Sequence, residues 1–424
     1  MMRITNNITI CLIFISGVIL LPDTSFATGK FSNPKGTAMA GAYIGLARGI
    51  DAPVWNPANL GLSTKNLRSI NLINLGFGLY NNSFTINQYN SYNGDSLTTE
   101  DIDDILNSVP DNGLNLFINA ESQLLSFASG LVAFSIEGLI NSNFQLDKKF
   151  LEVILRGNEM DRIYHFDNSH GEAYAVLSYN LSGALPLEIS QVKKFAIGGS
   201  LKFLQGFRYI KIIDTQGLMT TTTDGLEAHG NINFKSADGG NGIGFDIGVA
   251  SEIDEKWTVS MVLKNIFSQI NWAKSASEKS YSFLMDPITL DVFNDTDLDS
   301  IFKTDENEKS VAAISSSLPT EFHLGALYCY NNLSFTLDCV QSLKKKPGYS
   351  NTPQVAAGMQ YHVLPWLQLR TGIAVGGNER LKSAGGFGVN FIPVMLDFGI
   401  SNCGGMFLRN QRGLNLAFGI GLWL

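Results

Sequence analysis

"KKFAIGGSLKFLQGFRYIKI", residues 193–212, alternates large apolar residues with small or polar ones. Apolar side chains stand at odd positions from Phe195 to Tyr209, while the even positions include Ala, Gly, Ser, Lys and Arg. A period of two sustained over about 15 residues predicts a β-strand with one apolar and one polar face. The same alternation recurs at residues 243–249, 257–263, 333–338 and 394–400.

Two architectures use such strands, a soluble β-sandwich and a membrane β-barrel, and strand length distinguishes them. A soluble sandwich strand averages about five to six residues, whereas a tilted strand that spans a bilayer needs about 9 to 11. Several alternating runs here extend over about 10 to 17 residues. We therefore expect an all-β protein, a transmembrane antiparallel β-barrel. The segments counted from residue 65 onward number between 12 and 16, and about 14 is the central value for a barrel with an even strand count.

The low fraction of charged residues also agrees with a barrel whose apolar outer surface faces lipid rather than water. Only 16% of the 424 residues are charged, against about 25% in an average soluble domain. The net charge of −8 argues against a nucleic-acid partner, which requires a basic face. Residues 69–94 are uncharged but rich in Asn, so they do not suit a lipid-facing helix.

The N-terminus reads as a secretory signal over residues 1–27. Arg3 supplies a positive start, an apolar run follows, and Ser25-Phe26-Ala27 fits a cleavage site with small residues. Export together with long amphipathic strands predicts the outer membrane of a Gram-negative bacterium.

Two segments carry helical rather than strand periodicity. Residues 98–109 have apolar residues at helical spacing, Thr99 as a candidate cap and a stop before Pro110. Residues 146–157 start a helix near Asp147 and end it at Gly157, a residue suited to a C-cap. We expect both helices on external loops; the alternative is a pair of periplasmic turns with helical content.

Cysteine, histidine and acidic residues predict neither a disulfide framework nor a catalytic or metal site. Cys329, Cys339 and Cys403 remain after the signal is removed; if Asn331-Asn332 is a hairpin turn, Cys329 faces Ser334 and Cys339 faces Leu324. The run 295–306 resembles a calcium loop but has Ser where a Gly is required. The five histidines lack ligand spacing and no nucleophile elbow occurs, so we expect no enzyme, metal or cofactor, with a barrel lipase as the residual alternative.

A barrel of about 14 strands encloses a lumen too wide for wall side chains to fill, so it is plugged or it conducts water. Residues 28–64 are rich in Gly and Ala and too irregular for a lipid-facing strand. Asn56 can cap a helix that begins at Pro57. We expect this segment to fold back into the lumen as a plug.

The stretch "AMAGAYIGLARGIDAPVWNPANLGL", residues 38–62, resembles the N-terminal signature of the FadL-like outer-membrane transport family. Its Asn-Pro-Ala motif is Asn56-Pro57-Ala58, preceded by Gly41 and Asp51. The resemblance implies a hatch over residues 28–64, a barrel over residues 65–424, and a hydrophobic cargo that leaves sideways through the wall. It also implies outer-membrane lipid and the barrel-assembly machinery as partners. The chain departs from the family in ending on Leu424 rather than an aromatic residue, and in its two helical insertions.

Two functions remain open after the resemblance is considered. The first is uptake of small hydrophobic, fatty-acid-like molecules through the hatch. The second is a barrel that binds or shuttles surface or secreted proteins, as related barrels of a secretion system do. Asn56 is either a hatch pivot or a turn residue before a proline. Candidate ligand contacts in the lumen, which can equally be paired lumen charges, are Lys202, Arg208, Lys264 and Arg370.

Overall fold

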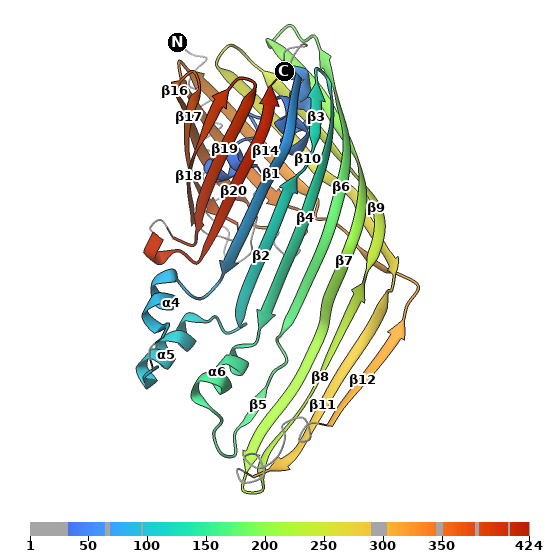
Figure 1. Cartoon of the computed structure of the whole chain (residues 1–424), viewed down its shortest axis with the longest axis vertical. Coiled ribbons are helices and arrows are strands. Elements are labelled where there is room, and N and C mark those ends of the chain that lie inside the picture. The colour runs from blue at the N-terminus through green and yellow to red at the C-terminus, as the bar shows by residue number, and fades with distance from the viewer. Residues whose placement is uncertain are drawn as a thin grey trace.

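The structure is a computed structural model, and it describes residues 33–63, 68–94, 96–289, 303–344, 351–377, 381–405 and 408–423. Its strands form a closed antiparallel β-barrel of 14 strands (Figure 1). This confirms the predicted fold class and the predicted strand number. The signal predicted at residues 1–27 lies outside the described residues.

Twenty strand segments make up the sheet. They are β1 (Arg68–Asn81), β2 (Leu114–Gln123), β3 (Ser126–Ser129), β4 (Val132–Leu146), β5 (Ile163–His165), β6 (His170–Leu187), β7 (Lys194–Thr222), β8 (Gly225–Ala237), β9 (Gly239–Glu252), β10 (Trp257–Lys274), β11 (Ser277–Ile288), β12 (Lys303–Ser310), β13 (Ile314–Ser316), β14 (Glu321–Tyr330), β15 (Leu333–Ser342), β16 (Gln354–Leu364), β17 (Leu367–Gly376), β18 (Leu381–Phe391), β19 (Val394–Cys403) and β20 (Gly413–Trp423).

The short helices lie in two groups. Within residues 33–63 they are α2 (Pro34–Ala38), η1 (Gly49–Asp51), α3 (Ala52–Trp55) and η2 (Pro57–Leu62). Between strands they are α4 (Ile86–Tyr92), α5 (Thr99–Ser108), α6 (Lys148–Arg156) and η3 (Leu408–Asn410).

Some barrel strands consist of successive segments, for example β2 with β3 and β8 with β9. Closure is direct, because β1 pairs antiparallel with β2 on one side and with β20 on the other. The remaining barrel strands follow as antiparallel neighbours in chain order.

The wall has the reverse polarity of a soluble fold. In β7, Leu201 and Phe203 are exposed on the outer face, whereas Ser200 and Lys202 are buried toward the lumen. The predicted alternation is therefore present in the structure, with its apolar side outward. Such an outer face suits contact with hydrocarbon rather than with water.

The two ends of the barrel differ in their connections. Two-residue turns such as Asn331-Asn332 and Ile392-Pro393 lie at the end where β1 begins and β20 finishes, whereas α4, α5 and α6 lie in long connections at the opposite end (Figure 1). The helix predicted from Asp147 to Gly157 is confirmed, with Asp147 as its N-cap and Gly157 as its C-cap. The cap of α5 is Thr98 rather than the predicted Thr99, because the Thr98 hydroxyl accepts from the Asp101 amide and the Asp101 carboxylate accepts from the Thr98 amide.

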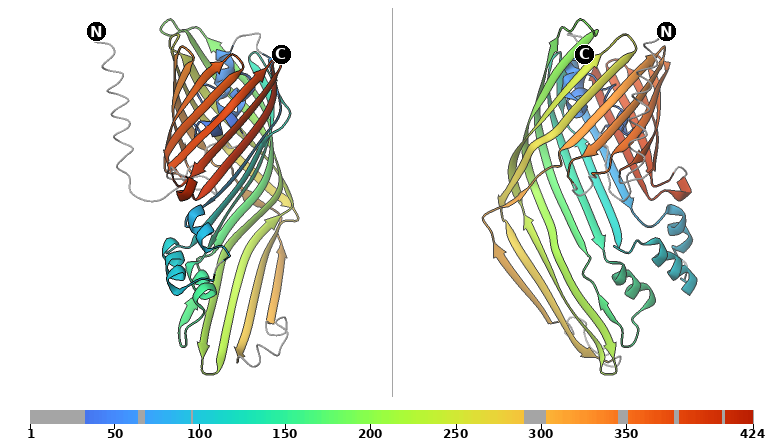
Figure 2. Two further views of the ribbon diagram at one scale, coloured as in Figure 1. Left: turned by 60° about the vertical axis from the view of Figure 1, so that its left-hand side comes forward. Right: turned by 180° about the vertical axis from the view of Figure 1, so that it is seen from behind.

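One side of the wall continues far beyond the rest as a sheet extension, formed by β5, residues 209–222 of β7, β8, β11 and β12 (Figure 2). β7 has 29 residues, which at about 3.3 Å per residue is roughly three times the thickness of a bilayer's hydrocarbon core. The outer strand β12 is fully exposed and carries five charged residues among its eight, KTDENEKS, which discourages pairing with another sheet edge.

The strand register also tests the predicted positions of the cysteines. Cys329 pairs with Ser334 and Cys339 with Leu324 across the hairpin, as predicted, and the three described cysteines are free. No helix within the described residues has both the length and the apolar content to cross a bilayer.

Candidate functional site

Residues 33–63, which we call the plug, lie inside the barrel near the end where β1 begins and β20 finishes (Figures 1 and 2). Almost all of these residues are buried. Trp55 is 1% exposed and packs with Tyr43 and Met39 in a cluster that also contains Val262 of the wall. The plug is thus a packed core rather than a loose tail.

Local sequence explains the compact path of the plug. The Asn33 side chain accepts a hydrogen bond from the Gly36 amide at 2.9 Å and caps α2, which begins at Pro34. Gly41, one of the predicted motif residues, has φ +98°, a conformation that glycine tolerates best. Gly36 lies against Trp55, where an added Cβ would stand 2.2 Å from the indole ring.

Asn56 holds the plug to the wall and also shapes the plug. Its Oδ1 accepts from the Ala58 amide at 3.0 Å, so it caps η2 at Pro57 as predicted. Its Nδ2 donates to the carbonyl oxygens of Val249 at 3.0 Å and Met261 at 3.2 Å, on the adjacent strands β9 and β10. One side chain therefore couples the Asn-Pro-Ala turn to two wall strands.

Glycines on the inner wall allow this close approach. A Cβ at Gly248 would stand 2.0 Å from Asn56 Oδ1, and one at Gly198 would stand 2.2 Å from the Ala58 nitrogen. No side chain fits at such distances, so these positions require glycine. Added Cβ atoms would also lie within 3 Å of plug atoms at Gly325, Gly358, Gly372, Gly386 and Gly399.

Asp51 is the polar centre of the plug. It accepts hydrogen bonds from Asn33 Nδ2 at 2.8 Å, Lys35 Nζ at 2.8 Å and the Tyr43 hydroxyl at 3.1 Å. Burial is the largest single influence and lowers the pKa of Lys35, but the attractions of Asp51, Tyr43 and Asp397 together outweigh it and hold that pKa above its ordinary value. The buried carboxylate is thus fully compensated by plug residues.

The polar network continues into the wall. Lys35 Nζ lies 3.7 Å from Asp397 of β19, and Asp397 accepts from Arg370 of β17 at 2.7 Å. The cavity beside these groups measures about 10 Å³, which is room for about one water molecule. Plug and wall are therefore closely packed beside these groups.

The predicted lumen cations have partners within the protein. Lys264 Nζ donates to the carbonyl oxygen of Val54 in the plug at 2.6 Å, and Lys202 Nζ lies 2.8 Å from Asp246. Arg208, expected in the lumen, is instead 53% exposed and pairs with Asp238. A register shift between Ala175 and Val176, opposite Phe207, reverses the alternation and turns Arg208 outward.

The plug also contacts the wall where the second barrel strand is interrupted between β2 and β3. Gln123 Nε2 donates to the Ile50 carbonyl at 3.3 Å, and the Ile50 amide donates to Ser69 Oγ at 2.9 Å. Asn71 Nδ2 donates to the carbonyls of Gln123 at 2.7 Å and Leu124 at 3.3 Å. Side-chain hydrogen bonds thus bridge the interruption of the wall between β2 and β3.

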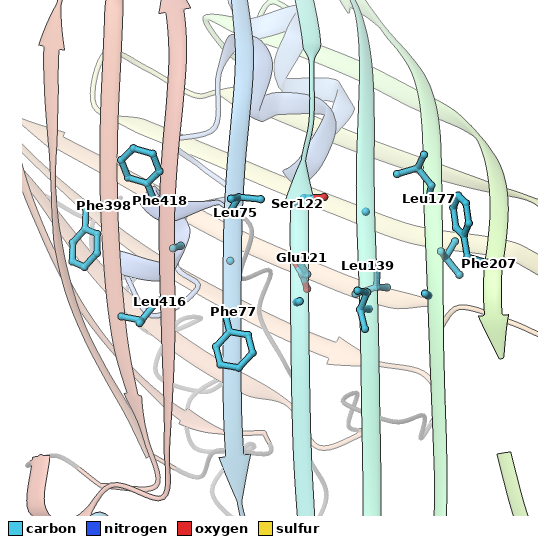
Figure 3. A pocket seen from close by; sticks show the side chains of 17 residues that line it. Leu75, Phe77, Glu121, Ser122, Leu139, Leu177, Phe207, Phe398, Leu416 and Phe418 are labelled. Atoms are coloured by element: carbon cyan, nitrogen blue, oxygen red, sulfur yellow. The ribbon is translucent and has the colours of Figure 1, made fainter. Parts of the chain in front are cut away.

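An apolar groove of about 630 Å³ lies on the outer face of the wall next to this interruption (Figure 3). Large side chains border it, including Leu75 and Phe77 of β1 and Phe207 of β7. Small residues such as Ala120 and Gly138 lie between them. Its volume is in the range typical of ligand sites.

Sequence reasoning missed several plug contacts. Asp338 of β15 accepts from the Ile44 amide at 2.9 Å, and Thr336 donates to the Ala42 carbonyl at 2.8 Å. Both residues stand at polar positions of an alternating strand, and this pattern could have identified them as side chains that face the lumen. Gln123 stands on the polar phase of β2 in the same way, whereas Lys35 lies outside any alternating strand and carried no such signal.

No cluster of three or more His, Cys, Asp or Glu side chains within the described ranges can hold a metal ion. Residues 295–302 of the calcium-like run lie outside the described residues, and Glu306 at its end lies in the exposed strand β12.

Comparison with known proteins gives a family and a fold. Residues 57–399 match the profile of a family of unknown function, DUF5723. No curated protein matches the sequence. Among solved structures, the Ralstonia pickettii toluene transporter TbuX matches with a TM-score of 0.50 at 13% identity, covering 94% of this chain and 99% of TbuX.

Two further solved structures agree. A Pseudomonas aeruginosa FadL homologue matches with a TM-score of 0.52 at 12% identity, covering 94% of this chain and 99% of the homologue. The Pseudomonas putida toluene transporter TodX matches with a TM-score of 0.51 at 10% identity, covering 95% and 99% of the two chains. At such identities the likeness is one of fold, and the fold is that of the FadL-like barrels named from the sequence.

Proposed function

The chain belongs to DUF5723, a family of unknown function, and from its plugged barrel we propose that it carries small hydrophobic molecules of fatty-acid-like size across a Gram-negative outer membrane. In this proposal residues 1–27 are a cleaved signal, residues 28–64 form the hatch, and residues 65–424 form the barrel. The chain acts as a carrier and not as an enzyme. It is inserted by the barrel-assembly machinery and surrounded by outer-membrane lipid.

The observation that supports the proposal is a buried plug bonded to the inside of a barrel whose outer wall is apolar. A barrel serving as an open pore would leave water-filled space, whereas here Asn56, Asp51 and Lys264 connect the plug to itself and to the wall. A cargo cannot pass straight through without moving these groups. Hydrophobic cargo has a second route, because the hydrocarbon around the barrel dissolves it.

We place the sideways exit at the interruption between β2 and β3. Gln123 connects this part of the wall to Ile50 of the plug, so displacement of the plug releases the side chain that helps to close it. In register, Asn74 pairs with Gln123 and the adjacent pair is Leu75 with Ser122, which line the outer groove. A cargo released there would enter an apolar surface site directly.

Uptake into proteoliposomes tests the function. Toluene and a labelled fatty acid should enter vesicles that contain the full-length protein faster than empty vesicles. Gln123→Leu should alter uptake by several-fold because it removes the connection to the plug, while Thr371→Val, on the exposed face of β17, should leave uptake unchanged. Equal rates for protein-containing and empty vesicles would reject the proposal.

A protein-shuttling barrel is the second candidate, and the sheet extension favours it. β7 and its neighbours present a long surface well outside any bilayer-spanning region. Affinity purification of full-length protein in a mild detergent separates the two candidates. A stoichiometric protein cargo supports shuttling, whereas co-purified hydrophobic small molecules support carriage.

A further inference from the structure

A row of inward-facing polar side chains crosses three neighbouring strands of the wall. Asn119 of β2 pairs in register with Asn141 of β4, and Asn141 pairs with Tyr174 of β6. All three side chains are buried, with exposed fractions of 1%, 0% and 6%. The row lies four ladder pairs from the level of Gln123, toward the end of the barrel that carries α4, α5 and α6.

The row contains polar atoms that have no hydrogen-bond partner among the described residues. They are Asn119 Oδ1, both polar atoms of the Asn141 amide and the Tyr174 hydroxyl. Leaving a buried polar group without a partner is costly, so natural proteins rarely retain one. Four such atoms on three adjacent strands indicate a surface arranged to receive polar hydrogen-bonding groups.

Carboxylates lie near the two ends of this row, Asn119 and Tyr174. The charged side chains that act most strongly on the Tyr174 hydroxyl are Glu172, Glu321 and Glu121. Glu121 also accepts from Asn119 Nδ2 at 3.5 Å, and Glu172 accepts from the Tyr209 hydroxyl at 3.1 Å. The field therefore favours a positive group and disfavours a carboxylate.

The other side of Tyr174 is apolar. Tyr174 belongs to a buried cluster with Tyr209 and Trp272, whose rings stack with centroids 5.3 Å apart. Trp272 lies over Gly206, where a Cβ would stand 2.3 Å from the indole, so the ring lies directly against the wall. Stacked aromatic faces attract cations as well as hydrocarbon.

We propose that Asn119, Asn141 and Tyr174 bind the protonated amine head of an amphiphilic cargo, whose hydrocarbon packs against Tyr209 and Trp272. The amide and phenol oxygens accept hydrogen bonds from the ammonium, and the carboxylates balance its charge. An inorganic cation would use the same oxygens but not the aromatic pair. This inference rests on the proposed carriage of hydrophobic molecules and names the head group that the carrier selects.

Calorimetric titration of the full-length protein in nanodiscs tests the head group. The probes are decylamine, decanol and decanoate, which share one chain length, and empty nanodiscs give the lipid background. We expect decylamine to bind at least about tenfold more tightly than either of the others. Equal affinities for decylamine and decanol, or tighter binding of decanoate, would overturn the proposal.

Two variants assign the binding to the row. Tyr174→Phe keeps the ring and removes the hydroxyl, and Asn141→Leu keeps the approximate volume and removes the amide. Each should weaken decylamine binding about three- to tenfold and leave decanol binding unchanged. Tyr179→Phe, in the same strand but bonded to Gln205 away from the row, is the matched control. Unchanged decylamine affinity in folded Tyr174→Phe protein would reject the assignment.

The remaining outcomes separate the inference from the proposed function. If K⁺ alone binds saturably and Asn141→Leu abolishes that binding, the site holds an inorganic cation and the inference fails. If decylamine shows no preference while toluene uptake continues, only the head-group assignment fails. If decylamine binds as expected but neither toluene nor the amine enters proteoliposomes, carriage fails while the site remains.

Discussion

Replacement of Asn56 tests whether the plug is held by its side chain or only by its packing. Asn56→Ala removes two hydrogen bonds to wall carbonyls and one helix cap. At about 1 kcal/mol for each bond and about 1 kcal/mol for the cap, the docked plug loses about 3 kcal/mol. This raises the population of the undocked plug about a hundredfold, since 1.4 kcal/mol is a factor of ten.

Single-channel recording in planar bilayers measures this change. Wild-type barrels should stay closed for most of the record, and Asn56→Ala should open about a hundred times more often. Asn56→Asp separates the two roles, because it keeps the cap acceptor at Ala58 but brings a carboxylate to the carbonyls of Val249 and Met261. It should open at least as often as Asn56→Ala if the wall bonds dominate.

The control is Asn87→Ala, at an exposed position of α4. If both Asn56 variants opened as rarely as the wild type, the idea that hydrogen bonds of Asn56 hold the plug in place would be refuted. A closed Asn56→Asp barrel beside an open Asn56→Ala barrel would instead assign the effect to the cap alone.

Further perturbations act on neighbouring contacts. Gly248→Ala should reproduce Asn56→Ala in conductance, since its Cβ would displace Asn56, whereas Gly199→Ala, with only ordinary contact at 3.5 Å, should not. Lys264→Met should increase opening about tenfold by deleting a charged hydrogen bond to Val54. Asp51→Asn should speed tryptic cleavage after Lys35, because the ammonium loses its carboxylate. Hydrogen bonds from the Thr98 amide and hydroxyl hold the pKa of Asp101 below its ordinary value of 3.8; this stabilises α5 above pH 3.8 and is lost as pH falls below it. Thr98→Ala removes only the hydroxyl bond, so the pH dependence of α5, followed by amide exchange, should become smaller.

The wall could be predicted from sequence because alternation is a local signal. A period of two identifies which side chains face outward, and Lys202, Lys264 and Arg370 are all buried toward the lumen as their phase requires. The same reasoning failed at Arg208, because one extra residue at the register shift reverses the inward and outward positions that follow it. A bulge leaves no composition signal, so phase counted across it fails.

Only part of the plug's structure could be predicted from the sequence. The cap at Asn56 follows from an Asn-Pro step, yet the partners of its amide nitrogen are carbonyl oxygens more than 190 residues away. Lys264 and Gln123 likewise bond plug carbonyls, at Val54 and Ile50. A carbonyl is present at every residue, so sequence pattern cannot single out which one accepts.

The glycines of the wall tie these observations to mechanism. Close packing of the plug requires residues without a side chain at Gly198, Gly248 and the equivalent positions of other strands. A wall shaped to the plug backbone binds it in one position, and any displacement exposes polar carbonyls such as those of Val249 and Met261 to the lumen. The plug is therefore expected to move between two discrete positions rather than to loosen gradually, because intermediate positions leave these groups without partners.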